Sequence, residues 1–217
     1  MRRAFVILAV MCCAAVAAAQ ERLFGSLALP EECRQAIVVG PSANGSGYTA
    51  TLISYDEGHA TEEYSTRCSV GYGGIAAMGT KREGDGKSPE GVYALRRGLC
   101  YVRDFESSLP MELYDEDDMW SEDAESPYYN TLVRNPKPDA KGDRLWERRT
   151  TQYRYIVVVE YNTDPVVKGR GSAIFIHAWR GEGKRTAGCI GMAEEDVKRI
   201  VEWLDPKLNP HIVITRK

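Results

Sequence analysis

Short runs of β-branched and aromatic residues, separated by glycine- and proline-rich turns, recur along most of this 217-residue chain. Runs of this length and composition are typical of β-strands with one or both faces buried. One segment, 193–205, instead has apolar residues at helical spacing, with acidic residues in its first turn where the helix dipole favours them. We therefore predict a mainly β domain, with β-sandwich-like mixed sheets and one clear C-terminal α-helix. The clearest predicted strands are 34–40, 45–56, 153–162, 171–179 and 211–215.

The first twenty residues have the layout of a secretory signal peptide. Two arginines precede an apolar run, and three consecutive alanines follow it. The alternative is an uncleaved membrane anchor, but the run is shorter than the roughly 20 apolar residues that a spanning helix needs. We expect a signal peptide (1–19), an N-terminal lead-in (20–35) and one domain (36–216). The mature protein would be exported, with no stable membrane anchor.

Charge and cysteine spacing argue against two kinds of ligand. The formal net charge is −3, whereas a nucleic-acid-binding protein usually has a basic face. No two cysteines have the C-x-x-C spacing of a zinc site or a thioredoxin-type redox motif. We therefore expect neither nucleic acid nor a metal ion as a partner.

Export would place the cysteines beyond the signal peptide in an oxidising compartment, where thiols are often bridged. Cys33, Cys68, Cys100 and Cys189 allow three complete pairings, and the sequence does not choose among them. If Cys189 stays a free thiol, only one bridge is possible. We favour Cys33 with Cys68, because both flank predicted strands in the N-terminal region.

Two residues near the C-terminus have side chains suited to nucleophilic catalysis. His177 lies near the end of a predicted strand, and Cys189 follows Gly188 in a glycine-rich segment. A thiol becomes a strong nucleophile when a neighbouring base or positive charge favours its thiolate, and His177 could be that base. Taken singly, a histidine is more often structural and a cysteine more often buried and inert, so only the combination is informative.

The segment from Glu112 to Glu125 has eight acidic residues and no basic one. We expect it to be irregular, and its simplest interpretation is a solvated loop. The alternative is a flap over a charged substrate. Trp120, Tyr128 and Tyr129 favour the flap, because aromatic residues in a polar loop often cover a ligand.

The combined pattern is more specific than its parts. A strand that carries His177, a glycine-rich loop and then Thr186-Ala-Gly-Cys189 resembles the active-site signature of L,D-transpeptidase (YkuD-type) catalytic domains. Three further segments resemble this family, and together the similarity covers about residues 36 to 216. These segments are Met78–Leu95, Asp117–Asn130 and Val157–His177.

The resemblance implies an exported cell-wall enzyme that acts on the stem peptides of peptidoglycan. Cys189 would be the nucleophile and His177 the base, and the backbone amides of Gly188 and Cys189 would stabilise the oxyanion. Attack on a stem tetrapeptide would release D-Ala and leave a thioester. An amine would then accept the acyl group in a transpeptidase, or water in an L,D-carboxypeptidase. No metal or organic cofactor is implied, and the oligomeric state stays open.

The same resemblance suggests substrate-binding residues. Thr186 would shape the turn, and its hydroxyl could touch the substrate. Arg180, with Lys184 and Arg185, could meet carboxylates, whereas Asp118 or Asp123 could meet an amine. The remaining candidates, from the acidic segment, are Trp120, Tyr129 and Asn130.

Two departures from the family pattern bear on the activity. Ala187 stands where many members have a second histidine, and the loop between His177 and Cys189 is shorter. Another group, such as a backbone carbonyl, would have to orient the His177 ring. We interpret the chain as a compact-loop branch of the family. The rival is a catalytically inactive wall-binding module: a low-pKa Cys189 thiol would favour the enzyme, and an inert thiol the module. A papain-like hydrolase is disfavoured, since its cysteine precedes its histidine.

Overall fold

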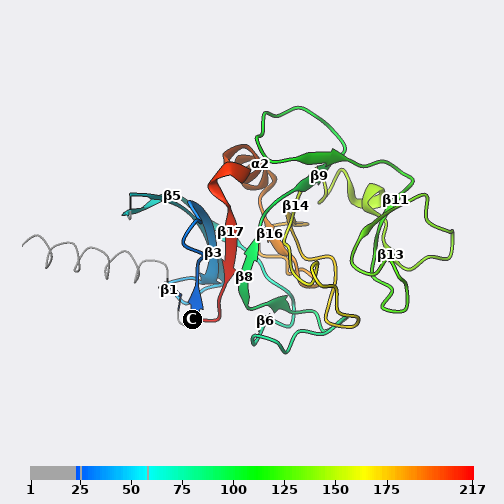
Figure 1. Ribbon diagram of the computed structural model, residues 1–217, viewed down its shortest axis with the longest axis horizontal. Helices are drawn as coiled ribbons and strands as arrows, with labels where there is room; N and C mark the ends of the chain where they lie inside the picture. Colours follow the sequence, from blue (N-terminus) through cyan, green and yellow to red (C-terminus); the bar gives the residue numbers. More distant parts are fainter. Residues whose placement is uncertain (1–22, 25, 58) are drawn as a thin grey trace, which may run out of the picture.

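The computed structural model describes residues 23–24, 26–57 and 59–217 (Figure 1). The expected signal peptide and the start of the lead-in lie outside these residues. In the part of the chain that is described, no helix has the length and apolar character needed to cross a membrane. Three larger sheets follow one another from left to right in Figure 1.

The first sheet has five strands in the order β5-β4-β3-β17-β8. Neighbouring strands are antiparallel except β3 and β17, which run parallel. Ile37 and Val39 of β3 face the main core, whereas Ala36 packs on the opposite face with Leu27 and Leu29 of the lead-in. The strands are β5 (His59–Cys68), β4 (Tyr48–Asp56), β3 (Gln35–Pro41), β17 (His211–Ile214) and β8 (Gly91–Ala94).

The second sheet, in the order β10-β9-β14-β15-β16, carries the candidate site. Its alternate residues face two different cores: Val157 and Ile176 pack toward the first sheet, whereas Ile156 and Phe175 pack away from it. The helix α2 (Glu194–Trp203) contacts β14 and β15 and buries its apolar stripe in the main core. The strands are β10 (Met111–Leu113), β9 (Gly98–Cys100), β14 (Tyr155–Val158), β15 (Phe175–Ala178) and β16 (Ile190–Met192).

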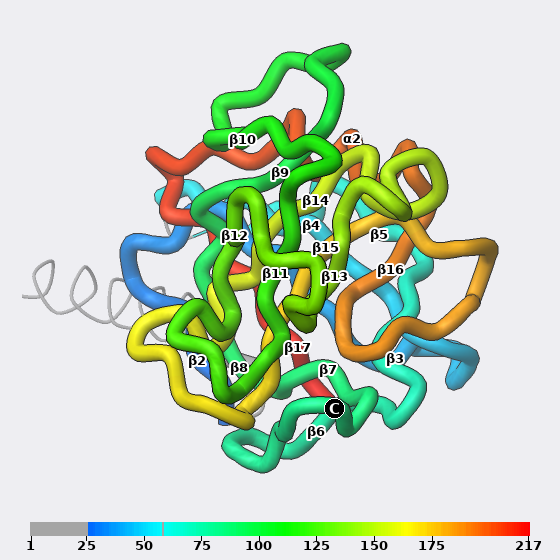
Figure 2. The backbone as a smooth tube through the Cα atoms, turned by 90° about the vertical axis from the view of Figure 1, so that its right-hand side faces the viewer, coloured from blue at the N-terminus to red at the C-terminus, as the bar shows by residue number. Residues whose placement is uncertain are grey.

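The third sheet, in the order β12-β11-β13, is antiparallel and lies in the acidic segment and the residues after it. Figure 2 shows its strands in front of β14 and β15. All of β11 is buried. Asp118 forms an ion pair with Arg134, and Trp120 packs on Phe175 with ring centres 4.9 Å apart. The expectation of irregular structure is therefore wrong here. The strands are β11 (Asp118–Ser121), β12 (Leu132–Arg134) and β13 (Gly142–Asp143).

Short elements complete the fold. β1 (Leu23–Phe24) pairs with β2 (Leu27–Ala28) in a two-stranded sheet. β6 (Ile75–Ala76) pairs with β7 (Ser88–Pro89) in another. Two 3-10 helices span Leu145–Arg148 and Pro206–Leu208.

The prediction of a mainly β fold with one helix near the C-terminus is confirmed. Two strands are shorter than predicted: β14 occupies the middle of the run 153–162, and β15 occupies the C-terminal part of the run 171–179. Asn162 and Ala173 have φ angles of 55° and 52°. This left-handed backbone interrupts an extended strand, so β-branched composition alone overestimates strand length.

The favoured Cys33–Cys68 disulfide is wrong. The described cysteines are buried thiols, and the Cys33 thiol donates to the carbonyl oxygen of Gln35 at 3.1 Å. Cys68 lies opposite Tyr48, and Tyr48 lies opposite Pro41, at the far end of β3 from Cys33. The residues from 33 to 41 span roughly 25 Å when extended, whereas a disulfide needs Cα atoms within about 7 Å.

Candidate active site

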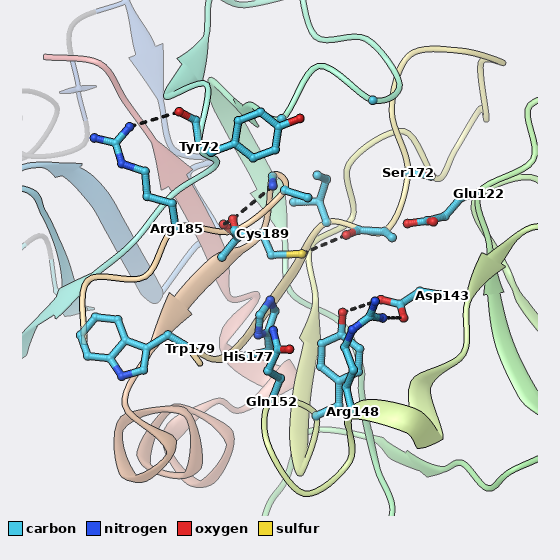
Figure 3. A pocket seen from close by; sticks show the side chains of 18 of the residues that line it. Tyr72, Glu122, Asp143, Arg148, Gln152, Ser172, His177, Trp179, Arg185 and Cys189 are labelled. Carbon is cyan, nitrogen blue, oxygen red and sulfur yellow. Dashed lines mark hydrogen bonds and ion pairs between the residues drawn. The ribbon is translucent and has the colours of Figure 1, made fainter. Parts of the chain in front are cut away.

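A cavity of about 380 Å³ lies beside the Thr186–Cys189 turn, between the loop that carries Lys81 and the 3-10 helix after β13. His177 and Cys189 both line it. Figure 3 shows the imidazole of His177 next to the Cys189 side chain. Most of the remaining wall is polar or charged, so the cavity suits a ligand with polar or charged groups.

Strand pairing brings the backbone at His177 and next to Cys189 onto neighbouring strands. β15 and β16 are parallel neighbours in which His177 pairs with Gly191 and Ile176 with Ile190. Cys189 directly precedes β16 and is therefore one strand spacing, about 4.8 Å, from β15. Because alternate residues of a strand face the same side, the side chains of His177 and Cys189 project from the same face of the sheet.

A backbone carbonyl orients the His177 ring. Nδ1 lies 2.7 Å from the carbonyl oxygen of Ala178, and because a carbonyl only accepts, Nδ1 carries the proton. This leaves Nε2 unprotonated and able to accept a proton. The edge of the Tyr153 ring packs against the imidazole, with centroids 5.1 Å apart. Burial lowers the pKa of His177 to about 4, so the ring is a neutral base at physiological pH.

Cys189 is a protonated thiol in this resting state. Its Sγ donates to the carbonyl oxygen of Ala173 at 3.1 Å. Burial raises the pKa of Cys189 to about 12. A backbone hydrogen bond from Phe175 lowers this pKa, and the negative charge of Glu122 raises it. The pair is thus neutral thiol and neutral imidazole, and the low-pKa thiol that would have marked an enzyme most simply is not present. Burial of the thiol, which disfavours its charged form, is the main cause.

The Thr186 hydroxyl fixes the turn that carries Cys189. It donates to the carbonyl oxygen of Cys189 at 2.6 Å and accepts from the N–H of Gly188 at 3.1 Å. Gly188 has φ +152°, and a Cβ there would lie 3.0 Å from the carbonyl oxygen of Lys87. Glycine therefore allows the close approach of the loop that carries Lys87.

The two expected oxyanion donors differ in availability. The N–H of Gly188 already donates to Thr186. Within the described ranges, no hydrogen-bond acceptor contacts the N–H of Cys189. The Cys189 amide is therefore the backbone donor that stays available beside the thiol.

Trp120 and Asn130, two of the expected substrate-binding residues, are buried behind the cavity and do not line it. Asn130 is 3% exposed, and its Oδ1 accepts from Trp120 Nε1 and from the N–H of Ala173, both at 3.0 Å. Its Nδ2 donates to two carbonyl oxygens, those of Tyr161 and Asn162. Asn130 thus holds the N–H of Ala173, the residue whose carbonyl oxygen accepts the Cys189 thiol.

Tyr129 and Asp123 also lie outside the cavity wall. The buried Tyr129 hydroxyl donates to Glu83 Oε2 at 2.5 Å and accepts from the N–H of Gly171, which anchors the cavity loop. Asp123 accepts from the N–H of Glu125 and lines a separate groove. Asp118, the other acid considered for an amine, is paired with Arg134 in β11 and β12.

Thr186 and Arg180 do line the cavity, together with Lys184 and Arg185. These three basic side chains have no ion-pair partner within the described part of the chain. By contrast, the cavity residues Lys81 and Arg148 form ion pairs with Asp85 and Asp143. These three residues thus bring to the cavity positive charge that no described ion pair neutralises.

Glu122 also lines the cavity, although the sequence did not single it out from the other acidic residues of its segment. Its carboxylate lines the cavity, and no described side chain or backbone group forms a hydrogen bond or ion pair with it. Desolvation by the surrounding protein raises the pKa of Glu122, and the negative charge of Glu83 raises it further. The acidic segment was a signal, but which acid faces the cavity depends on where β11 ends.

A mainly β domain with a histidine base beside a buried thiol defines a candidate site for acyl transfer through a cysteine. The family model for the L,D-transpeptidase catalytic domain (YkuD) matches residues 36–213, most of the chain. The chain therefore belongs to this family. None of the curated proteins matches it significantly.

Solved structures with a similar fold share little sequence with the chain. The helical cell shape determining protein Pgp2 of Campylobacter jejuni, in a mutant form, is 16% identical with a TM-score of 0.48, and the match covers 88% of this chain and 50% of that one. Bd1075 of Bdellovibrio bacteriovorus is 15% identical with a TM-score of 0.45, over 84% and 48%. The chain spans about half the length of each.

Proposed function

We propose that this protein is an exported cysteine acyltransferase that acts on peptidoglycan stem tetrapeptides. Membership of the L,D-transpeptidase catalytic domain family supports the substrate class. The observation that carries the proposal is the geometry of His177, whose Nδ1–H is held by Ala178 while the ring shares one cavity with the Cys189 thiol. A fixed tautomer with a free Nε2 is what a general base requires.

In the first half-reaction, Cys189 Sγ attacks the carbonyl carbon that joins the diamino acid to the terminal D-Ala, and the thiol proton passes to His177 Nε2. The oxygen of the tetrahedral intermediate accepts a hydrogen bond from the N–H of Cys189. The carbon–nitrogen bond then breaks, and His177 returns the proton to the leaving amine. D-Ala departs and a thioester remains on Cys189.

In the second half-reaction, an amine of a neighbouring stem, or of another protein or amino acid, attacks the thioester and gives its proton to His177. The carbon–sulfur bond breaks, and the Cys189 thiol is restored with the proton from His177. The product with a second stem is a 3-3 cross-link. Water in place of the amine leaves a tripeptide, which is L,D-carboxypeptidase activity.

The neutral resting pair sets the order of events. With a Cys189 pKa of about 12 and a His177 pKa of about 4, proton transfer before the substrate arrives is strongly unfavourable. Attack and proton transfer are therefore coupled and occur when a carbonyl carbon lies against the sulfur. An enzyme of this kind has a poorly reactive thiol at rest, so low thiol reactivity does not identify an inactive module.

The charges of the cavity orient a zwitterionic peptide. Arg180, Lys184 and Arg185 line the cavity and would meet the carboxylates of the stem, and Glu122 would offer its unpaired carboxylate to the free amine of the diamino acid. Glu122 replaces Asp118 and Asp123 as our candidate for the amine, because those acids are outside the cavity wall.

Mass spectrometry of a purified disaccharide-tetrapeptide, incubated with the mature protein or with Cys189→Ala, tests the proposal. A cross-linked dimer with released D-Ala is the expected product of a transpeptidase. Tripeptide alone would mean that water is the acceptor. If the two proteins give the same unreacted substrate, the protein is a wall-binding module without this chemistry.

A further inference from the structure

Ser88, the first residue of β7, has a buried hydroxyl that contacts the catalytic turn. The residue is 0% exposed, and its Oγ donates to the carbonyl oxygen of Gly188 at 2.7 Å. Ser88 Oγ also accepts a hydrogen bond from the N–H of Gly71 at 3.0 Å, and this contact fixes the hydroxyl in place. Ser88 does not line the cavity, and the reaction described above assigns it no part.

The contact controls the direction of the Cys189 amide. The peptide between Gly188 and Cys189 is trans, so its C=O and N–H point in opposite directions. Holding the Gly188 oxygen toward Ser88 therefore points the N–H of Cys189 away from Ser88. This is the N–H without an acceptor among the described residues.

Among the described residues, no other side chain forms a hydrogen bond with this peptide plane. The Thr186 hydroxyl binds the N–H of Gly188 and the carbonyl oxygen of Cys189, which belong to the two neighbouring peptide units. The plane between them has the carbonyl oxygen of Gly188, and the hydrogen bond to that oxygen comes from Ser88. Because glycine has little steric restriction, this plane can rotate unless something outside the turn restrains it.

We propose that Ser88 is a positioning residue that presents the N–H of Cys189 to the oxyanion. This inference rests on the proposed acyl transfer at Cys189. When Sγ adds to a carbonyl carbon, the carbonyl oxygen gains negative charge, and a donor that is already oriented stabilises it without reorganisation. Thr186 and Ser88 together lock three consecutive peptide planes around the nucleophile.

The test compares Ser88→Ala with Ser88→Thr, which keeps the hydroxyl. Loss of an oxyanion donor lowers kcat by about 100- to 1000-fold, and loss of its restraint should cost less, so we expect about 10- to 100-fold for Ser88→Ala. The KM for the stem tetrapeptide should change little, and Ser88→Thr should recover most of the rate. A Ser88→Ala variant with an unchanged kcat would overturn the proposal.

Alkylation by iodoacetamide separates positioning from a general structural role. Displacement of iodide at carbon forms no oxyanion, so Ser88→Ala should alkylate Cys189 within about twofold of the wild-type rate. If alkylation and acylation fall together, Ser88 only supports the fold and the proposal is wrong. The unfolding midpoint of each variant provides the matching stability control.

An aryl acetate ester makes the test independent of the natural substrate. Intact mass measures acetylation of Cys189 through the same kind of tetrahedral intermediate. If the ester reacts in the wild type but the stem tetrapeptide does not, the proposed substrate is wrong, whereas a slowed Ser88→Ala acetylation still supports Ser88 as a positioning residue. A wild type that reacts with neither would contradict a preformed oxyanion donor.

Discussion

The Cys189 thiol donates to the carbonyl oxygen of Ala173, and the N–H of Ala173 donates in turn to Asn130. Ala173 has a φ of 52°, which costs a residue with a Cβ roughly 1 kcal/mol or more. One of the four hydrogen bonds of the Asn130 side chain holds Ala173 in this conformation, and the other three fix the Asn130 amide itself. The resting position of the nucleophile is thus set by a side chain outside the cavity.

Replacing Asn130 should destabilise the protein. Asn130→Ala leaves the buried Trp120 Nε1 and the N–H of Ala173 without their acceptor, and we expect a loss of about 2–4 kcal/mol in the free energy of unfolding. Denaturant unfolding measures it. The matched control is Asn135→Ala. Both asparagines have a positive φ, of 59° at Asn130 and 49° at Asn135, but the Asn135 side chain is exposed. Similar losses in both variants would mean that only the backbone conformation matters.

The pH dependence of acylation follows from the lowered pKa of His177. The base is the neutral ring, which in the free enzyme persists from high pH down to about pH 4. We therefore expect kcat/KM to stay nearly constant as pH falls through 6.5, with the acid limb between about pH 4 and 5. A limb centred near 6.5 would show that the ring is solvated during turnover.

The same pKa predicts how stability changes with pH. The unfolded chain protonates His177 near pH 6.5 and the folded chain only near pH 4, so burial of the neutral ring costs nothing above pH 6.5 and progressively more below it. Between those values the wild type should lose up to about 3 kcal/mol relative to His177→Asn. Equal pH dependence of unfolding in the two proteins would contradict a buried neutral imidazole.

Glu122→Gln should weaken binding of stems that carry a free amine. Loss of the carboxylate removes one charge-assisted contact, so we expect KM to rise about 5- to 10-fold with little change in kcat. A stem with its amine acetylated should show no such difference. Glu125→Gln is the control, since Glu125 lies on the same segment but does not line the cavity. A similar KM change with the acetylated stem would exclude an amine contact.

Glu122 also acts on the thiol. Its negative charge contributes to the raised pKa of Cys189, so Glu122→Gln should lower that pKa and speed alkylation by iodoacetamide at a fixed pH near 8. Glu125→Gln should leave the alkylation rate unchanged. Slower alkylation in Glu122→Gln would mean that its main role is to shape the cavity.

Much of the fold follows from local sequence patterns. The apolar stripe of Val197, Ile200 and Val201 predicts α2 because it repeats at helical spacing, and the β-branched runs predict the central strands. β11 was missed because its stability is not local. Asp118 depends on Arg134, sixteen residues away, and Trp120 on a ring in another sheet, and neither contact has a periodic signal.

The site could be predicted only in part for a related reason. His177 and Cys189 are identified by a motif in which strand and turn are contiguous, and parallel pairing then brings them together. The roles of Ser88 and Asn130 depend on hydrogen bonds to residues 100 and 43 positions away. Whether Glu122 or its neighbour Asp123 faces the cavity depends on the turn after β11, which charge patterning does not specify.

Release of D-Ala from a disaccharide-tetrapeptide tests the central claim most directly, because it precedes the choice between amine and water. We predict that the wild type releases D-Ala and forms a thioester on Cys189 detectable by intact mass, whereas Cys189→Ala folds normally but does neither. His177→Ala should lose most of the rate while retaining the free thiol. D-Ala release by Cys189→Ala at the wild-type rate would contradict the account.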